Sequence, residues 1–129
     1  MSTINDVLND VIDLAEQTIP YQKIIIGNTP PTNGISMFIS SGSPTLTDLE
    51  KGMIVSLHVM CNAKHRNQEE AFDALSDIHK HLTKKTSYPN ETDYQITNIS
   101  TVSYPNLLLR EENGEYVFGS TLNVEFYWR

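Results

Sequence analysis

The sequence has a single cysteine, Cys61, among its 129 residues, so it cannot form an intramolecular disulfide. This excludes the small disulfide-stapled folds and fits a reducing compartment. No apolar run approaches the roughly 20 residues that are needed to cross a bilayer. The start, MSTINDVLND, lacks the basic residues and the unbroken apolar stretch of a signal peptide. We therefore expect no secretion signal and no membrane partner.

Basic residues are also scarce. Nine Lys and Arg stand against sixteen Asp and Glu, which gives a formal net charge of −7. The densest basic clusters are Lys64 with Arg66 and Lys84 with Lys85. Tight binding to nucleic-acid phosphates needs larger clusters than these. The charge therefore argues against a nucleic-acid groove, although an acidic wall can serve DNA by repelling it along a passage.

The combinations of side chains that carry out chemistry are missing as well. His79 and His81 are two apart on a predicted helix, and His58 and Cys61 are three apart on a predicted strand, so the members of each pair diverge. No zinc-binding spacing is present, and GNTPPTNG lacks the lysine and the glycine spacing of a phosphate loop. We therefore expect no enzyme activity, no catalytic residue, no metal ion and no cofactor. Cys61 is expected to be a buried, inert thiol.

Two stretches have the three- and four-residue apolar spacing of amphipathic helices. The first covers residues 4–19, with its acids mainly opposite the apolar stripe, and ends before Pro20. The second follows Asn67, a good N-cap residue with Glu70 three positions later. Its stripe consists of Ala71, Phe72, Leu75, Ile78 and Leu82.

Strand patterns occupy much of the remaining chain. Strands are expected at residues 21–26, 35–39, 53–62 and 94–102, and the third should be central because both of its faces carry apolar side chains. Between them SSGSPTLTDLEKG, residues 40–52, is rich in small residues and turn formers. This composition is typical of a long loop or a flexible hairpin tip. Such a segment is either a functional loop or an ordinary wide turn, and the sequence does not decide between them.

The last part of the chain, LLLREENGEYVFGSTLNVEFYW, has the most regular pattern. From Tyr116 to Trp128 the even positions are apolar except for Ser120, which predicts a half-buried strand. Asn113-Gly114 tolerates positive φ and predicts a hairpin turn. Residues 107–110 should then return along residues 116–119, with the charged cluster at an exposed tip.

These elements predict an α+β fold: two amphipathic helices packed on one face of a largely antiparallel, five- to six-stranded sheet. Residues 1–129 are expected to form a single domain. The strand faces away from the helices carry more apolar side chains than free solvent favours, which indicates contact between subunits. The residues concerned are Ile54, Met60, Val117 and Tyr127.

This layout, and above all LLREENGEYVFGSTLNVEF, resembles the tail terminator family of long-tailed bacteriophages, whose members are often labelled minor capsid proteins. The resemblance covers nearly all of the chain and is most specific in the final third. Family members usually have Asp where this chain has Glu111, and often a basic residue where it has Glu115, so an ion pair made there by relatives is not carried over. The matching positions are Pro105, Leu107, Arg110, Glu111, Glu112, Asn113, Gly114, Tyr116, Phe118 and Asn123.

The resemblance implies a single tail-terminator-like domain that acts as a structural virion protein. It implies a ring, expected to be a hexamer, that caps the tail tube, ends tube polymerisation and provides the surface for head joining. The implied partners are other copies of the chain, the tail tube protein and the head-completion protein, with DNA passing through without specific binding. The implied location is the tail–neck region of the virion, after assembly in the host cytoplasm.

Contacts with the tube or a neighbouring subunit are expected at two segments, with Arg110 pairing with an acid across the subunit boundary. Their residues are Leu46, Asp48, Leu49, Glu50, Arg110, Glu111, Glu112 and Asn113. Three alternatives remain open. One is a head-completion or neck protein, a head–tail connector. The second is a small host α+β ligand-binding domain or enzyme, which would have a deep pocket with convergent polar groups. The third is a soluble α+β adaptor domain with a protein partner and no link to a phage.

Overall fold

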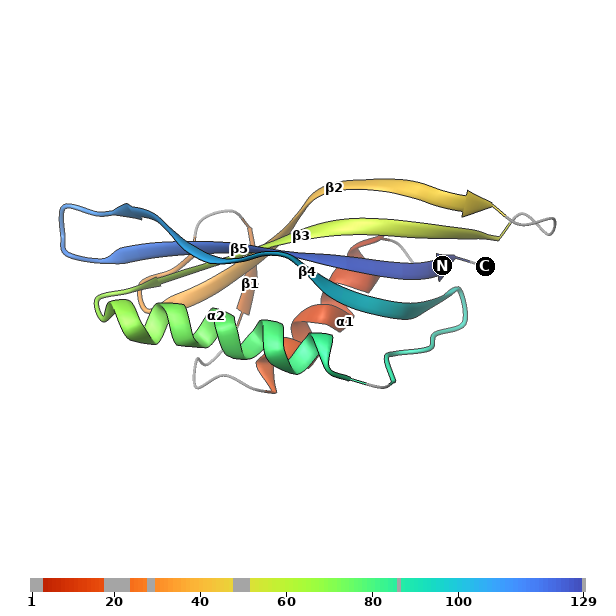
Figure 1. Cartoon of the computed structure of the whole chain (residues 1–129), viewed down its shortest axis with the longest axis horizontal. Helices are drawn as coiled ribbons and strands as arrows, with labels where there is room; N and C mark the ends of the chain where they lie inside the picture. The colour runs from red at the N-terminus through yellow and green to blue at the C-terminus, as the bar shows by residue number, and fades with distance from the viewer. Residues whose placement is uncertain (1–3, 18–23, 28–29, 48–51, 86, 129) are drawn as a thin grey trace.

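The computed structural model describes residues 4–17, 24–27, 30–47, 52–85 and 87–128, and of residues 43–47 it describes the backbone alone. The five strands of these ranges form one sheet in the order β1-β2-β3-β5-β4, with β1 parallel to β2 and the other pairs antiparallel. Both helices lie on the same face of this sheet (Figure 1), as predicted. The elements are α1 (Ile4–Glu16), β1 (Ile24–Ile26), β2 (Gly34–Thr47), β3 (Met53–His65), α2 (Gln68–Thr83), β4 (Tyr94–Arg110) and β5 (Tyr116–Trp128).

The core lies between the two helices and the sheet, and β3 and β5 contribute most of its sheet residues. Alternate side chains of these strands point towards the helices, as the period of two predicts. Even Ser120, the polar residue in the apolar series of β5, is buried, and its hydroxyl donates to the carbonyl oxygen of Cys61 at 3.4 Å. The buried helix-facing residues are Val55, Leu57, Val59, Cys61, Ala63, Phe118, Ser120, Leu122, Val124 and Phe126.

Asn67 caps α2 as predicted. Its side-chain oxygen accepts from the amides of Glu69 and Glu70 at 3.0 and 3.4 Å. The Glu70 carboxylate does not close a capping box; it lies 2.7 Å from Nε2 of His65, whose Nδ1 accepts from the Asn67 amide at 2.8 Å. Phe72 was expected on the buried stripe, but it is 41% exposed because it lies at the margin of the helix–sheet contact.

The largest difference from the sequence prediction is in residues 40–52, which were expected to be a loop or hairpin tip. The prediction is wrong up to Thr47, because β2 pairs with β3 as far as Thr47↔Met53. The register is irregular between Ile39 and Ser41 and between Pro44 and Leu46, next to the proline of this stretch. Residues 48–51 lie outside the described residues.

The other boundaries differ less. β3 runs three residues further than predicted, to His65, and β4 continues through Pro105 to Arg110 instead of ending at residue 102. Four irregularities in the β4–β5 register allow this longer strand. α1 begins at Ile4, as predicted, and ends at Glu16, while the predicted helix end at residue 19 lies outside the described residues. Of the strand predicted at 21–26, residues 24–26 form β1 and residues 21–23 lie outside the described residues.

The strands give the molecule two distinct ends. At one end, Met53 of β3 is opposite both Thr47 of β2 and Trp128 of β5. At the other end, residues 111–115 connect β4 to β5 (Figure 1). Leu46 and the segment from Arg110 to Asn113, which were expected to make assembly contacts, are therefore at opposite ends of the sheet.

Candidate functional site

The charged turn between β4 and β5 is internally hydrogen-bonded. The Glu111 amide donates to the Glu115 carbonyl oxygen at 2.7 Å, and the Gly114 amide donates to the Glu111 carbonyl oxygen at 3.0 Å. Gly114 has φ +90°, so glycine is needed there, whereas Asn113 does not adopt positive φ. The predicted hairpin is confirmed: residues 107–110 return along β5 from Tyr116, and residues 111–115 form the connection.

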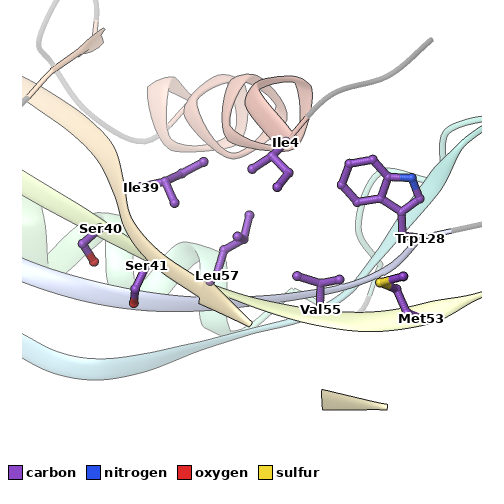
Figure 2. A pocket seen from close by; sticks show the side chains of 9 residues that line it. Ile4, Ile39, Ser40, Ser41, Met53, Val55, Leu57 and Trp128 are labelled. Atoms are coloured by element: carbon purple, nitrogen blue, oxygen red, sulfur yellow. The ribbon is translucent and has the colours of Figure 1, made fainter. Parts of the chain in front are cut away.

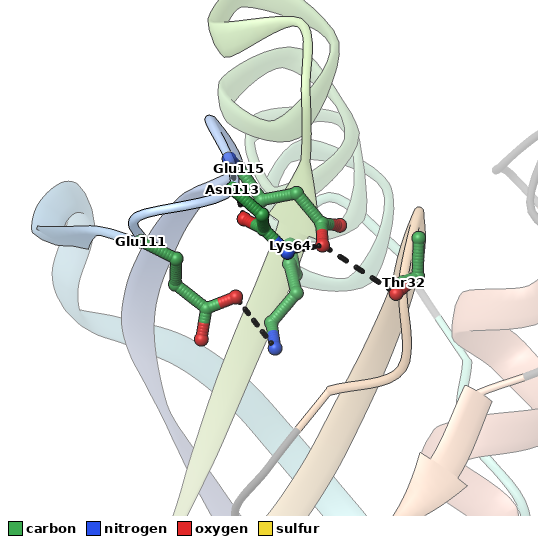
Figure 3. A network of polar contacts seen from close by, with 5 residues as sticks. All are labelled: Thr32, Lys64, Glu111, Asn113 and Glu115. Carbon is green, nitrogen blue, oxygen red and sulfur yellow. Dashed lines mark hydrogen bonds and ion pairs between the residues drawn. The ribbon is translucent and has the colours of Figure 1, made fainter.

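Carboxylates of this turn bind elements of their own chain (Figure 3). Oε1 of Glu115 accepts from Nδ2 of Asn113 at 2.8 Å and from the Thr32 hydroxyl at 3.5 Å. Nζ of Lys64, on β3, lies 3.1 Å from Oε1 of Glu111. Glu115 is 2% exposed, although the sequence predicted a solvated cluster, and its two hydrogen-bond donors come from the β1–β2 connection and from the turn itself. These contacts fix the turn against the body of the protein.

Arg110 and Glu112 differ in their surroundings. The guanidinium carbon of Arg110 lies 5.5 Å from the centre of the Tyr116 ring, a cation–π distance. Glu112 is exposed. Pairing of Arg110 with an acid of another subunit stays a prediction.

The second predicted contact segment is only partly described. Leu46 belongs to β2, where its backbone is opposite Ile54. Asp48, Leu49 and Glu50 lie outside the described residues. The structure therefore does not bring Leu46 together with Arg110, Glu111, Glu112 and Asn113.

The second half of β4 forms an exposed apolar strip that the sequence analysis did not assign to a contact. β4 is an outermost strand of the sheet, and the residues of this strip are between 48% and 70% exposed. The run of three leucines was a usable signal, because adjacent strand residues point to opposite faces and cannot all be buried by helices on one face. The residues of this strip are Val102, Tyr104, Leu107, Leu108 and Leu109.

The sheet face away from the helices exposes fewer apolar side chains than the sequence predicted. Val117 is only 7% exposed, so it does not belong to an open surface. Ile54, Met60 and Tyr127 are half-buried. A Cβ added to Gly52 would lie 2.1 Å from the Tyr127 hydroxyl, so Tyr127 packs directly over this glycine.

An apolar pocket of about 380 Å³ lies between the start of α1 and the end of the sheet where β5 terminates (Figure 2). Its volume is within the range of small-molecule sites. Its polar wall is limited to Ser40, Ser41 and backbone, and Ser40 donates to the His58 carbonyl oxygen at 3.2 Å. The pocket therefore lacks the convergent polar groups that fix a ligand. Its apolar lining comes from Ile4, Ile39, Met53, Val55, Leu57 and Trp128.

Two titratable side chains of the core, Cys61 and His79, have shifted pKa values because they are buried. Burial raises the pKa of the Cys61 thiol to about 12, so the thiol is protonated and inert, as expected. Burial lowers the pKa of His79 to about 4, and Nδ1 of His79 lies 2.9 Å from the Thr101 hydroxyl. Within the described ranges, no three His, Cys, Asp or Glu side chains are placed to hold a metal ion. No helix of these ranges is long and apolar enough to span a membrane.

Two acidic side chains of α1 accept hydrogen bonds from other elements of the fold. The Asp10 carboxylate accepts a hydrogen bond from the Tyr94 hydroxyl, and Oε2 of Glu16 accepts from the Ile24 amide at 2.8 Å. Burial, followed by the Asp10 hydrogen bond, raises the pKa of Tyr94, so the hydroxyl remains a donor. These acids join α1 to β4 and β1.

Comparisons with known proteins give a fold but no family. No protein-family profile matches the chain, and no curated protein matches it by sequence. Its structure is similar to that of a chain in a solved structure described as "Virion of native gene transfer agent (GTA) particle". The TM-score is 0.53 at 8% sequence identity, and the match covers 91% of this chain and 84% of that chain. At this identity the likeness establishes a shared fold alone.

Proposed function

We propose that this chain is a structural virion protein of a tailed phage or phage-like particle. In this proposal it forms a ring on the finished tail tube, ends tube polymerisation and presents a surface for head joining. The observation that carries the proposal is the fold shared over 91% of the chain with a component of a gene transfer agent virion. The resemblance of the 107–128 stretch to tail terminators supports the more specific role.

The surface of the chain fits assembly better than chemistry. The exposed apolar strip on β4 is typical of a contact surface, and it lies beside a turn whose Glu111 and Glu115 carboxylates bind Lys64, Asn113 and Thr32. The apolar pocket has no convergent polar groups that would position a substrate. The proposal therefore assigns the chain no reaction and no cofactor.

The proposed partners follow from the role. They are other copies of this chain, in a hexameric ring, the tail tube protein and the head-completion protein. DNA passes through the ring without specific binding, and the net charge of −7 suits a passage that must not retain it. The proposed location is the tail–neck region of the virion, with assembly in the host cytoplasm.

Deletion of the gene in a particle-producing strain tests the role. Negative-stain images of the lysate should show abnormally long tails if the chain ends tube growth, and a plasmid copy of the intact gene should restore the normal length. Heads without tails beside free tails of normal length would reject tube termination and assign the chain to the neck. Particles of normal form and yield would reject both roles.

A further inference from the structure

The exposed apolar side chains of this protein are concentrated on the two outermost strands of its sheet. Of the ten large apolar side chains that stand exposed in the described ranges, seven lie on β1 or β4. A single exposed apolar side chain is ordinary, but a group along a strand edge marks a contact surface. The seven are Ile25, Ile26, Val102, Tyr104, Leu107, Leu108 and Leu109.

The strand registers put these two groups at the same level of the sheet. Ile25 of β1 is opposite Ser36 of β2, and the ladder continues through Asn62 and Gly119 to Asn106 of β4. Asn106 lies within the exposed apolar strip of β4. The apolar part of one edge therefore has an apolar counterpart directly across the molecule.

Neither edge carries the charges that usually prevent an outer strand from pairing with another chain. β2 has no charged residue from Gly34 to Thr47, and β4 has none before Arg110. Charged residues make up 19% of the whole sequence, so their absence from these long strands is selective. Pro44 and two register irregularities interrupt β2 from Ile39 onwards and leave β1 and the start of β2 regular. On β4, Pro105 and three of the four irregularities lie between Thr101 and Leu109, within the exposed strip itself.

The directions of the strands also match. The pairings make β4 antiparallel to both β1 and β2. When copies repeat in one orientation around an axis, β4 of one copy therefore meets β1 and β2 of the next in the antiparallel sense. This sense gives slightly more stable pairing than the parallel one.

We propose that the β4 edge of one copy of this chain docks on the β1–β2 edge of a second copy, so that the sheet continues across the contact. The occupant is a second copy because the two edges belong to one chain and match in level, direction and apolar character. Each copy has one edge of each kind, so the contact is head-to-tail and can close a ring. This inference rests on the proposed function, for which it supplies the contact between neighbouring subunits.

Cysteines placed on both edges test the contact by disulfide cross-linking. Three double variants share Ile26→Cys on β1. Each carries one further cysteine on β4, namely Val102→Cys, Tyr104→Cys or Leu107→Cys. Cys61 can stay in place because it is fully buried. Under mild oxidation at least one double variant should give a ladder of dimers, trimers and larger species on a non-reducing gel, while every single variant stays monomeric.

A charge on the edge provides the matched control. Leu109→Lys in the cross-linking chain should abolish the ladder, whereas Asn9→Lys, on the exposed side of α1, should leave it unchanged. Circular dichroism and thermal unfolding identify the variants that are folded before oxidation. No ladder from any folded pair would overturn the contact. A dimer from a single variant would also overturn it, since two identical edges would then have met.

The outcome separates this inference from the role of the ring. If deletion of the gene lengthens tails but no folded pair cross-links, the edge contact is wrong and tube termination stands. If the ladder forms but deletion leaves tail length unchanged, the edge contact stands and tube termination is wrong.

Discussion

Acidification should destabilise the fold through His79, a residue buried between α2 and β4. The side chain is 1% exposed, its Nδ1 lies 2.9 Å from the Thr101 hydroxyl, and its Nε2 has no hydrogen-bond partner among the described residues. Burial lowers its pKa from 6.5 to about 4, because the charged imidazolium would lose its hydration. The unfolded chain therefore takes up the proton at a higher pH than the folded protein.

The sign and size of the effect follow from these two pKa values. The stability contributed by neutral His79 is fully present above 6.5, falls as the pH is lowered towards about 4, and changes little below that. Each pKa unit corresponds to about 1.4 kcal/mol, so the shift from 6.5 to about 4 corresponds to a loss of at most about 3.5 kcal/mol.

Urea denaturation of the wild type and of His79→Leu, at several pH values between about 7 and about 4, measures this loss. The other titrating groups are common to both chains, so the difference between their unfolding free energies isolates His79. This difference should shift in favour of the leucine variant by up to about 3.5 kcal/mol as the pH falls. His58→Gln, a histidine replacement on β3, serves as the control. A difference that stays constant across the pH range would refute the argument, because His79 would then bind protons equally in both states.

Three further changes probe the local structure by chemical denaturation. Asn67→Ala removes the cap of α2 and should lower the unfolding free energy by about 1 kcal/mol, whereas the exposed neighbour change Gln68→Ala should stay within about 0.5 kcal/mol. Gly119→Ala would put a methyl group 2.7 Å from Cδ1 of Leu108 and 2.9 Å from Oδ1 of Asn62 and should cost about 1–3 kcal/mol; if adding Leu108→Ala recovers none of this, the Leu108 contact is not the cause. Tyr94→Phe removes the hydroxyl that donates to a carboxylate of α1 and should cost about 1 kcal/mol, and an unchanged midpoint would show that this bond contributes nothing.

The sequence predicted the elements whose signals are local. β5 has the predicted bounds because its alternation is nearly unbroken, and Asn67 caps α2 because an N-cap depends only on the next few residues. β2 beyond Ile39 was missed for the opposite reason. Its serines, glycine and proline are typical of a loop, and they become a strand because β3 provides the neighbouring ladder.

The candidate surface was predictable in part. The position and charge of the β4–β5 turn followed from Asn113-Gly114, but the burial of Glu115 did not, because Thr32 is 83 residues away in the chain. The exposed strip on β4 was visible as three leucines, yet its meaning depended on β4 being an outermost strand. Strand order is a property of the whole sheet, which no local pattern contains.

The central pairing of β3 with β5 has a consequence for how the chain acquires its structure. The β2–β3 and β4–β5 hairpins join neighbouring segments, whereas the β3–β5 ladder joins strands separated by α2 and β4. Formation of that ladder carries the larger loop-closure cost and should limit the folding rate. During synthesis β3 leaves the ribosome before β5 is made. One backbone edge of β3 therefore lacks its hydrogen-bonding partner during this interval, and the nascent chain is then most prone to aggregate.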